Sequence, residues 1–229
     1  ILYIFTVNVI KGVARWRLKM ETIKSGIYSN YGYNEEDVEQ VKISINKIKK
    51  DGYFKGCNNL NIYYQVFSVI NEKGRIVISH GFSECIEKYN ELIYYFTEMG
   101  YSVYAIEHRG HGRSGSFGKK HKSQISIDKF EYYVEDLRIF LDTIVVGKDV
   151  DLYLYAHSMG GAIGTMFLEK YCGYFKKAIL SAPMMDINTG EYHKAISYLI
   201  SQIYINIGKG EEFLFGQGPF EGKYDLESS

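Results

Sequence analysis

The sequence contains few of the residues that mark disordered, disulfide-rich or zinc-binding proteins. Only 2 of its 229 residues are proline, and with 46% hydrophobic and 24% charged residues the composition leaves little room for long disordered tracts. The three cysteines, Cys57, Cys85 and Cys172, are isolated along the chain. Because an odd number of isolated cysteines fits neither a disulfide framework nor a zinc knuckle, we expect a reducing, cytoplasmic compartment.

The chain also lacks an excess of charge of either sign. Its 27 Lys and Arg residues balance 27 Asp and Glu residues. No global basic field therefore favours a nucleic-acid partner, and we predict none.

No N-terminal hydrophobic run is long enough to cross a bilayer. The opening "ILYIFTVNVI" (1–10) contains ten mostly apolar residues, about half of what a transmembrane helix needs. It fits a buried strand, a helix, or the remnant of a longer anchor or signal segment. The basic residues that follow are compatible with peripheral contact with an anionic membrane, and also with an ordinary solvated face; they are Lys11, Arg15, Arg17, Lys19 and Lys24.

What the chain does contain is a regular alternation of strand and helix patterns. Residues 34–50 place acids first and lysines last, as an exposed helix would. Further helices are predicted at 87–100, 127–145 and 159–173, and strands at 59–70, 75–81, 101–109, 151–158 and 176–183. Such an alternation predicts an α/β fold in one domain, with a mainly parallel sheet covered by helices on both faces.

The alternation stops after Pro183. Residues 190–208 carry Ile196, Leu199, Ile200, Ile203 and Ile207 at helical spacing, and no strand follows. This helix is either part of a lid over an active site or a peripheral helix packed on the core. We therefore divide the chain into an N-terminal apolar and basic segment with its helix (1–50), the α/β core (51–183) and the start of a cap (184–229).

The stretch "YAHSMGG" (155–161) places Ser158 where a strand ends and a helix begins. Ligands of parallel α/β sheets gather at the carboxyl ends of strands. A nucleophilic serine needs a sharp turn flanked by small residues, a requirement that Ala156 and Gly160 meet. The Met159 N–H, at the helix N-terminus, is placed to donate to a developing oxyanion.

A second oxyanion donor is expected in the loop after the strand at 75–81. The segment "HGFSE" (80–84) lies there. Gly81 allows close approach of the backbone, and the Phe82 N–H is the natural donor. His80 taken alone would be an ordinary buried histidine, but its combination with Ser158 favours a site.

Three motifs carry a family resemblance: "SHGFSE", "EHRGHGRSG" and "YAHSMGG", preceded by "DGYFKG" (51–56). Over roughly residues 34–229 the chain resembles the α/β-hydrolase branch that contains bacterial lysophospholipases and monoacylglycerol lipases. The resemblance implies a serine hydrolase with Ser158 as nucleophile, the Phe82 and Met159 amides as oxyanion hole, and a cap over an acyl-chain pocket. It implies a loop-orienting role for Glu84. His108 and His111 are expected to be structural, and no metal site is predicted because no further ligand cluster accompanies them. Supporting residues are His80, Gly81, Glu84, His157 and Gly160.

Two features depart from the family pattern. Ala156 replaces the first Gly of GxSxG, and the family's triad Asp and His should follow the cap. His193, Asp186 and Asp225 are the only histidine and aspartates after Ser158, and none is assigned to the triad. We expect both partners beyond Ser229, which makes these 229 residues a nearly inactive part of an enzyme with an exposed sheet edge.

The expected function is hydrolysis of a carboxylic ester of a lysophospholipid or monoacylglycerol through an acyl-enzyme, without a metal or organic cofactor. Two alternatives remain open: an esterase or peptidase of the same fold for small soluble substrates, and a non-catalytic binding module. The basic loop "GKKHKSQ" (118–124) is either a phosphate-headgroup contact or a solvated loop. Headgroup, acyl length and oligomeric state are not determined by the sequence.

Overall fold

The computed structural model describes residues 5–10, 13–18, 35–116, 125–127, 129–145, 147, 149–186, 194–210 and 212–213. Its strands are β1 (Phe5–Ile10), β2 (Val13–Leu18), β3 (Lys49–Lys55), β4 (Asn61–Phe67), β5 (Arg75–Ser79), β6 (Ser102–Ile106), β7 (Leu152–His157) and β8 (Lys177–Ser181). Its helices are α1 (Glu35–Asn46), α2 (Asn90–Glu98), α3 (Glu131–Thr143), α4 (Met159–Lys170) and α5 (Lys194–Asn206), with short 3-10 turns η1 (Cys57–Asn59) and η2 (Ile86–Tyr89).

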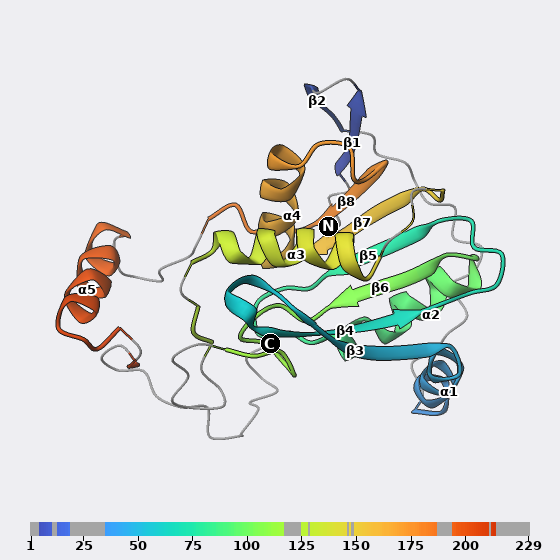
Figure 1. Ribbon diagram of the computed structural model, residues 1–229, viewed down its shortest axis with the longest axis horizontal. Coiled ribbons are helices and arrows are strands. Elements are labelled where there is room, and N and C mark those ends of the chain that lie inside the picture. Colours follow the sequence, from blue (N-terminus) through green and yellow to red (C-terminus); the bar gives the residue numbers. More distant parts are fainter. Residues whose placement is uncertain are drawn as a thin grey trace.

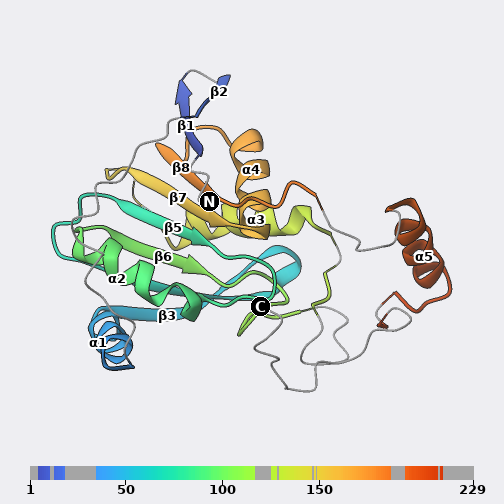
Figure 2. The same ribbon diagram turned by 180° about the vertical axis from the view of Figure 1, so that it is seen from behind.

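The strands form one sheet in the order β2-β1-β8-β7-β5-β6-β4-β3. The four central strands β8, β7, β5 and β6 run parallel, and both edges of the sheet are built from antiparallel pairs. Helices α3 and α4 cover one face (Figure 1), whereas α1 and α2 cover the other (Figure 2). The predicted α/β fold, with its mainly parallel sheet between helices, is confirmed.

Each face of the sheet has its own apolar cluster. On one face, Leu137 and Phe140 of α3 and Phe167 of α4 are fully buried against strand residues such as Leu154. On the other face, Ile93 of α2 packs with residues of α1, β4 and β5. Burying a large apolar side chain contributes about 1.5–3 kcal/mol, so these clusters hold the helices on the sheet.

The N-terminal helix ends earlier than predicted. We expected residues 34–50 to end in lysines, but α1 stops at Asn46 and its last turn holds no basic residue. Lys49 and Lys50 instead begin β3, a strand that the sequence analysis did not predict. The reason is tertiary: all seven residues of β3 pair with β4, from Lys49 opposite Phe67 to Lys55 opposite Asn61.

The outer edge of β8 is paired with another strand, although we had expected an exposed edge there. Strand β1 pairs antiparallel with β8 through Phe5 opposite Leu180 and Thr6 opposite Ile179. The apolar opening of the sequence thus contributes a strand that pairs with part of β8, so the expected exposed edge is partly covered there.

Helix α5 lies apart from the sheet in both views (Figures 1 and 2). Ile196, Leu199 and Ile203 of its apolar stripe, and Ile207 just after the helix, are all about half exposed or more. The described part of the chain therefore does not place this stripe in the core. The division at residue 184 and a lid role for this segment stay predictions.

Among the described residues, no helix is both long enough and apolar enough to cross a membrane. All three cysteines are free thiols.

Candidate active site

Ser158 lies in a sharp turn between β7 and α4, with φ 51° and ψ −117°. A positive φ is uncommon for a residue with a Cβ, so surrounding contacts must hold it. The Ser158 N–H donates to the Ser181 carbonyl at 3.0 Å, and the Ser158 carbonyl accepts from the Met184 N–H at 2.8 Å. The end of β8 and the residues that follow it therefore hold Ser158 through both its backbone N–H and its carbonyl.

Small residues beside Ser158 are required by close packing. A Cβ on Gly160 would collide with the backbone oxygens of Ser79 and His80, the latter at 2.5 Å. Ala156 is fully buried in the core. The predicted need for small residues at 156 and 160 thus has a steric cause, because the first turn of α4 is pressed onto the end of β5.

The loop Gly81–Glu84, here called the Gly81 loop, lies against this turn. A Cβ built on Gly81 would be 3.1 Å from the Ser158 Cβ. Within the part of the chain that the structure describes, neither the Phe82 nor the Met159 N–H donates a hydrogen bond. The structure thus brings Gly81 and Ser158 together, and the oxyanion-hole role of the two amides stays a prediction.

Glu84 ties the Gly81 loop down. Its Oε2 accepts from the Gly81 N–H at 2.8 Å and from the Tyr89 hydroxyl at 2.6 Å, and Lys88 donates to Oε1. Partial burial alone would raise the pKa of Glu84, but the hydrogen bonds from Lys88, Tyr89 and Gly81 together lower it. The resulting carboxylate supports the loop-orienting role implied for Glu84, and Tyr89 is a partner that the sequence analysis missed.

His157 precedes the serine and faces the same carboxylate. Its Nδ1 lies 3.1 Å from the Ser181 carbonyl oxygen, and its Nε2 lies 3.8 Å from Glu84 Oε1. It therefore stands between the end of β8 and the Gly81 loop.

His80, His108 and His111 form a buried cluster behind the Gly81 loop. The His80 ring lies 4.6 Å from that of His108 and 5.3 Å from that of His111, centroid to centroid. Burial lowers the pKa of His80 to about 4 and lowers that of His108 well below its usual value, so both rings are neutral at pH 7. Among the described residues, no group of three or more His, Cys, Asp or Glu is arranged to bind a metal ion.

Ion pairs hold the motif "EHRGHGRSG" in place. Buried Glu107 accepts from the Arg113 backbone and guanidinium. Arg109 pairs with Asp136 of α3, and a Cβ on Gly56 of "DGYFKG" would overlap that carboxylate. Asp136 was missed by the sequence analysis, although an acid between Val134 and Leu137 on the apolar stripe of α3 was a usable signal.

Partners for the Ser158 hydroxyl are not found among the described residues. No described histidine or carboxylate hydrogen-bonds its Oγ, and Asp186 lies exposed after β8. His193 and Asp225 lie outside the described residues, as does the basic loop 118–124.

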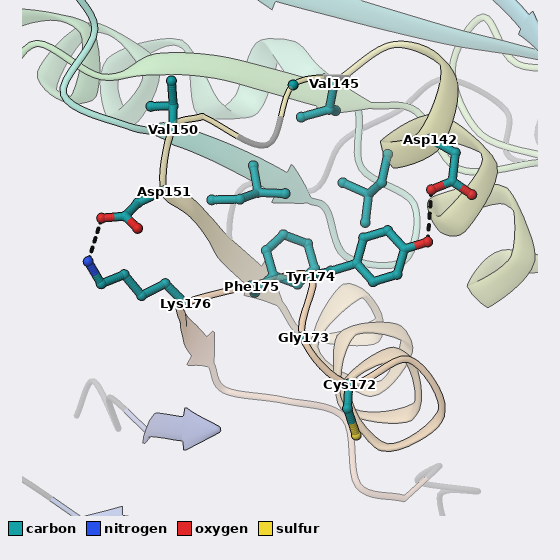
Figure 3. A pocket seen from close by; sticks show the side chains of 12 residues that line it. Asp142, Val145, Val150, Asp151, Cys172, Gly173, Tyr174, Phe175 and Lys176 are labelled. Carbon is teal, nitrogen blue, oxygen red and sulfur yellow. Dashed lines mark hydrogen bonds and ion pairs between the residues drawn. The ribbon is translucent and has the colours of Figure 1, made fainter. Parts of the chain in front are cut away.

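The structure also contains a pocket at the opposite, amino end of β7 and β8 (Figure 3). Leu152 and Phe175 are among its apolar lining residues. Lys176 pairs with Asp151, and the Tyr174 hydroxyl donates a hydrogen bond to Asp142. Because its polar groups are satisfied and it is remote from Ser158, we do not assign it to the reaction.

Comparison with known proteins identifies the family to which this chain belongs. The model of the family described as serine aminopeptidase, S33 matches residues 70–213, which is more than half of the chain. The chain belongs to this α/β-hydrolase family. The matched range contains the Gly81 loop, the "EHRGHGRSG" motif and the Ser158 turn.

Similar proteins within the α/β hydrolases include lipases. Lysophospholipase L2 of Escherichia coli (strain K12) is 35% identical over 141 residues, 61% of this chain and 41% of that protein. Monoacylglycerol lipase of Mycolicibacterium smegmatis is 29% identical over 150 residues, 64% of this chain and 51% of that protein. The crystal structure of a soluble variant of monoglyceride lipase from Saccharomyces cerevisiae shares the fold, with a TM-score of 0.55 and 20% identity over 70% of this chain and 52% of that one. The chain spans about half the length of the curated relatives it matches, or less.

Proposed function

We propose that this protein is a carboxylic-ester hydrolase that uses Ser158 as its nucleophile and acts on a lysophospholipid or monoacylglycerol. The observation that carries the proposal is the Ser158 turn itself, where a strained serine faces the Gly81 loop and two amides that have no acceptor among the described residues. Strain of this kind persists only where surrounding structure enforces it, and it is common at functional sites.

In the proposed reaction the Ser158 Oγ attacks the ester carbonyl carbon while a general base takes its proton. The carbonyl oxygen becomes an oxyanion that accepts from the Phe82 and Met159 N–H groups, and the α4 N-terminus adds favourable dipole potential. Collapse of this intermediate expels the alcohol, which takes the proton from the base, and leaves an acyl-enzyme. Water activated by the same base then hydrolyses the acyl-enzyme to the fatty acid and free Ser158. The chemistry needs no metal or organic cofactor.

The base and its orienting acid are proposed to lie in sequence that follows Ser229. A serine hydroxyl without a base is a weak nucleophile. Loss of a triad member leaves residual catalysis on the order of 10³- to 10⁴-fold over water. The 229 residues alone should thus be almost inactive.

Apolar side chains near the Ser158 turn support a lipid substrate. Phe82 is 58% exposed in the Gly81 loop, and Met185, which follows β8, is 70% exposed. Exposed apolar groups that flank a reactive centre favour acyl chains over small polar esters. The lysophospholipase and monoacylglycerol lipase relatives support the same substrate class. We also propose that the protein is cytoplasmic and contacts the membrane surface peripherally.

An alternative is a hydrolase of the same fold that acts on small soluble esters or peptides. The description of the family as a serine aminopeptidase favours this alternative. It predicts rates that do not depend on acyl chain length. A non-catalytic binding module is the third candidate and predicts no reaction at Ser158.

The test is covalent labelling with a fluorophosphonate probe. The 229-residue chain is compared with a protein extended through the coding sequence after Ser229, each with and without Ser158→Ala. We expect strong labelling of the extended protein, weak labelling of the 229 residues, and none after Ser158→Ala.

Ser68→Ala provides the matched control. Ser68 is exposed and lies beside Val69, whose N–H reaches Ser102 at the amino end of β6, so labelling should be unchanged. An extended protein that stays unlabelled would overturn the hydrolase proposal in favour of the binding module. Assays with monoacylglycerols and lysophospholipids of increasing chain length then separate the lipid substrate from the soluble-substrate alternative.

A further inference from the structure

A chain of buried hydrogen bonds joins the ends of β5 and β6 to the first turn of α4, next to Ser158. Ser79 ends β5, His80 follows it, and His108 follows β6 by two residues. Ser79 and His108 are fully buried and His80 is 1% exposed. Because these side chains are out of water, their polar atoms depend on partners inside the protein.

His80 determines how the peptide between Gly81 and Phe82 is oriented. Its Nδ1 lies 2.8 Å from the Gly81 carbonyl oxygen, and its Nε2 accepts from the His108 backbone N–H at 3.0 Å. An acceptor on one nitrogen and a donor on the other make the ring neutral, with its proton on Nδ1. The Gly81 carbonyl and the Phe82 N–H belong to one planar peptide, so holding the carbonyl aims the N–H.

The His108 side chain reaches the other half of the site through Ser79. His108 Nε2 lies 2.9 Å from the Ser79 Oγ, and that hydroxyl donates to the Gly160 carbonyl at 3.3 Å. Because the Ser79 hydroxyl donates its one proton to the Gly160 carbonyl, it must accept from His108, whose Nε2 therefore carries a proton. Its Nδ1 has no hydrogen-bond partner among the described residues, consistent with an unprotonated nitrogen there. Gly160 lies in the first turn of α4, beside Met159.

We propose that Ser79 and His108 are positioning residues that hold the Phe82 and Met159 amides at a fixed separation, an inference that rests on the proposed function. The backbone of His108 orients His80 and through it the Phe82 N–H. The side chain of His108 holds Ser79 and through it the first turn of α4. Oxyanion donors stabilise a transition state only when they are already in place, so loosening this link should lower kcat and leave KM nearly unchanged.

The kinetic test uses the extended protein with Ser79→Ala, His108→Phe and the double substitution. Phenylalanine keeps a ring between His80 and Tyr133, both of which pack on His108. We expect each single change to lower kcat about tenfold, less than the 10²- to 10³-fold loss of a deleted donor. The double variant should also lose about tenfold and not a hundredfold, because the two residues act as one unit. His108→Gln, which retains an N–H donor, should restore most of kcat.

Ser102→Ala is the matched control. Ser102 is also a buried serine, 1% exposed, and its hydroxyl accepts from the Val69 N–H at the opposite end of the sheet. Its kcat should stay within about twofold of the unsubstituted protein. The inference would be overturned if the kcat losses of Ser79→Ala and His108→Phe multiplied in the double variant, or if Ser102→Ala lowered kcat as much as they do.

A second measurement does not depend on activity. Nitrogen-15 spectra of the histidine rings in the 229-residue chain should give the Nδ1–H tautomer for His80 and the Nε2–H tautomer for His108. Ser79→Ala should shift the His108 signals, and the opposite tautomers would overturn the hydrogen-bond chain. If the unsubstituted extended protein hydrolyses no ester, the proposed function fails and the catalytic inference with it. If the unsubstituted extended protein is active and its Ser79→Ala variant has the same kcat, the inference fails while the proposed function stands.

Discussion

The Arg109 guanidinium and the Asp136 carboxylate form a buried two-point ion pair. Nε lies 2.7 Å from Oδ2 and Nη2 lies 2.9 Å from Oδ1, and each side chain is only 1% exposed. Asp136 Oδ1 also accepts from the Cys57 N–H at 2.7 Å. One carboxylate of α3 thus joins the loop after β6 to the turn before β4.

Breaking this pair should strongly destabilise the fold. Asp136→Asn leaves the Arg109 charge buried without a counter-charge, and we expect a loss of about 3–5 kcal/mol in the free energy of unfolding, measured with urea. The control is Asp142→Asn, which breaks an exposed pair in which Arg138 Nη1 lies 2.7 Å from Asp142 Oδ2. Exposed pairs contribute less than about 1 kcal/mol. Equal losses at the two positions would contradict the role of burial.

Gly160→Ala should disrupt the Ser158 turn. The new Cβ would meet the Ser79 and His80 carbonyl oxygens, and backbone cannot move aside as a side chain can. We expect a loss of about 3 kcal/mol in the free energy of unfolding, at the upper end for overpacking, and loss of fluorophosphonate labelling. Gly164→Ala, whose Cβ would first meet a Leu154 methyl at 3.0 Å, should cost less than about 1.5 kcal/mol. A Gly160→Ala protein of normal stability and labelling would show that the turn is less tightly packed than described.

Tyr89→Phe should loosen the Gly81 loop. Tyr89 is 6% exposed and donates to Glu84 Oε2, so removing its hydroxyl should cost about 1–2 kcal/mol in the free energy of unfolding. Slower labelling of Ser158 should accompany this loss. Tyr95→Phe removes a comparable bond to Glu91 on the exposed side of α2 and should change neither quantity measurably. Similar effects of both substitutions would argue against a specific role for the Tyr89 hydroxyl.

Acid should destabilise the protein through its buried histidines. The pKa of His80 falls from 6.5 to about 4 on folding. Between these values the unfolded chain binds the proton and the folded one does not, so stability is lost as the pH falls from 6.5 to 4. The loss from His80 alone should be about 3 kcal/mol.

Urea unfolding of the wild-type protein and of His80→Gln at pH 7 and pH 4.5 measures this effect. Carboxylates that titrate over the same range are present in both proteins and cancel in the comparison. The pH dependence should be shallower in His80→Gln, and identical dependences would rule out a buried neutral His80.

The elements that the sequence predicted well are those whose pattern is local. Residues 152–157 and 159–170 form the expected strand and helix, because an apolar run followed by Gly160 and Gly161 suits only a tight strand-to-helix turn. Strand β3 was missed because "KKDGYFK" has no apolar alternation; it exists through its pairing with β4. The edge of β8 was misjudged for a similar reason, since β1 lies more than 160 residues away in the sequence.

The sequence by itself determined the α/β architecture and the place of Ser158 at a strand end, because hydrophobic periodicity and small residues at a turn act over a few residues. The tertiary structure alone decided which buried side chains hold that neighbourhood together. Ser79, His108 and Asp136 each meet their partners only after distant strands and helices pack. Their hydrogen bonds exist because burial removes water as a competitor, and burial is a property of the whole fold.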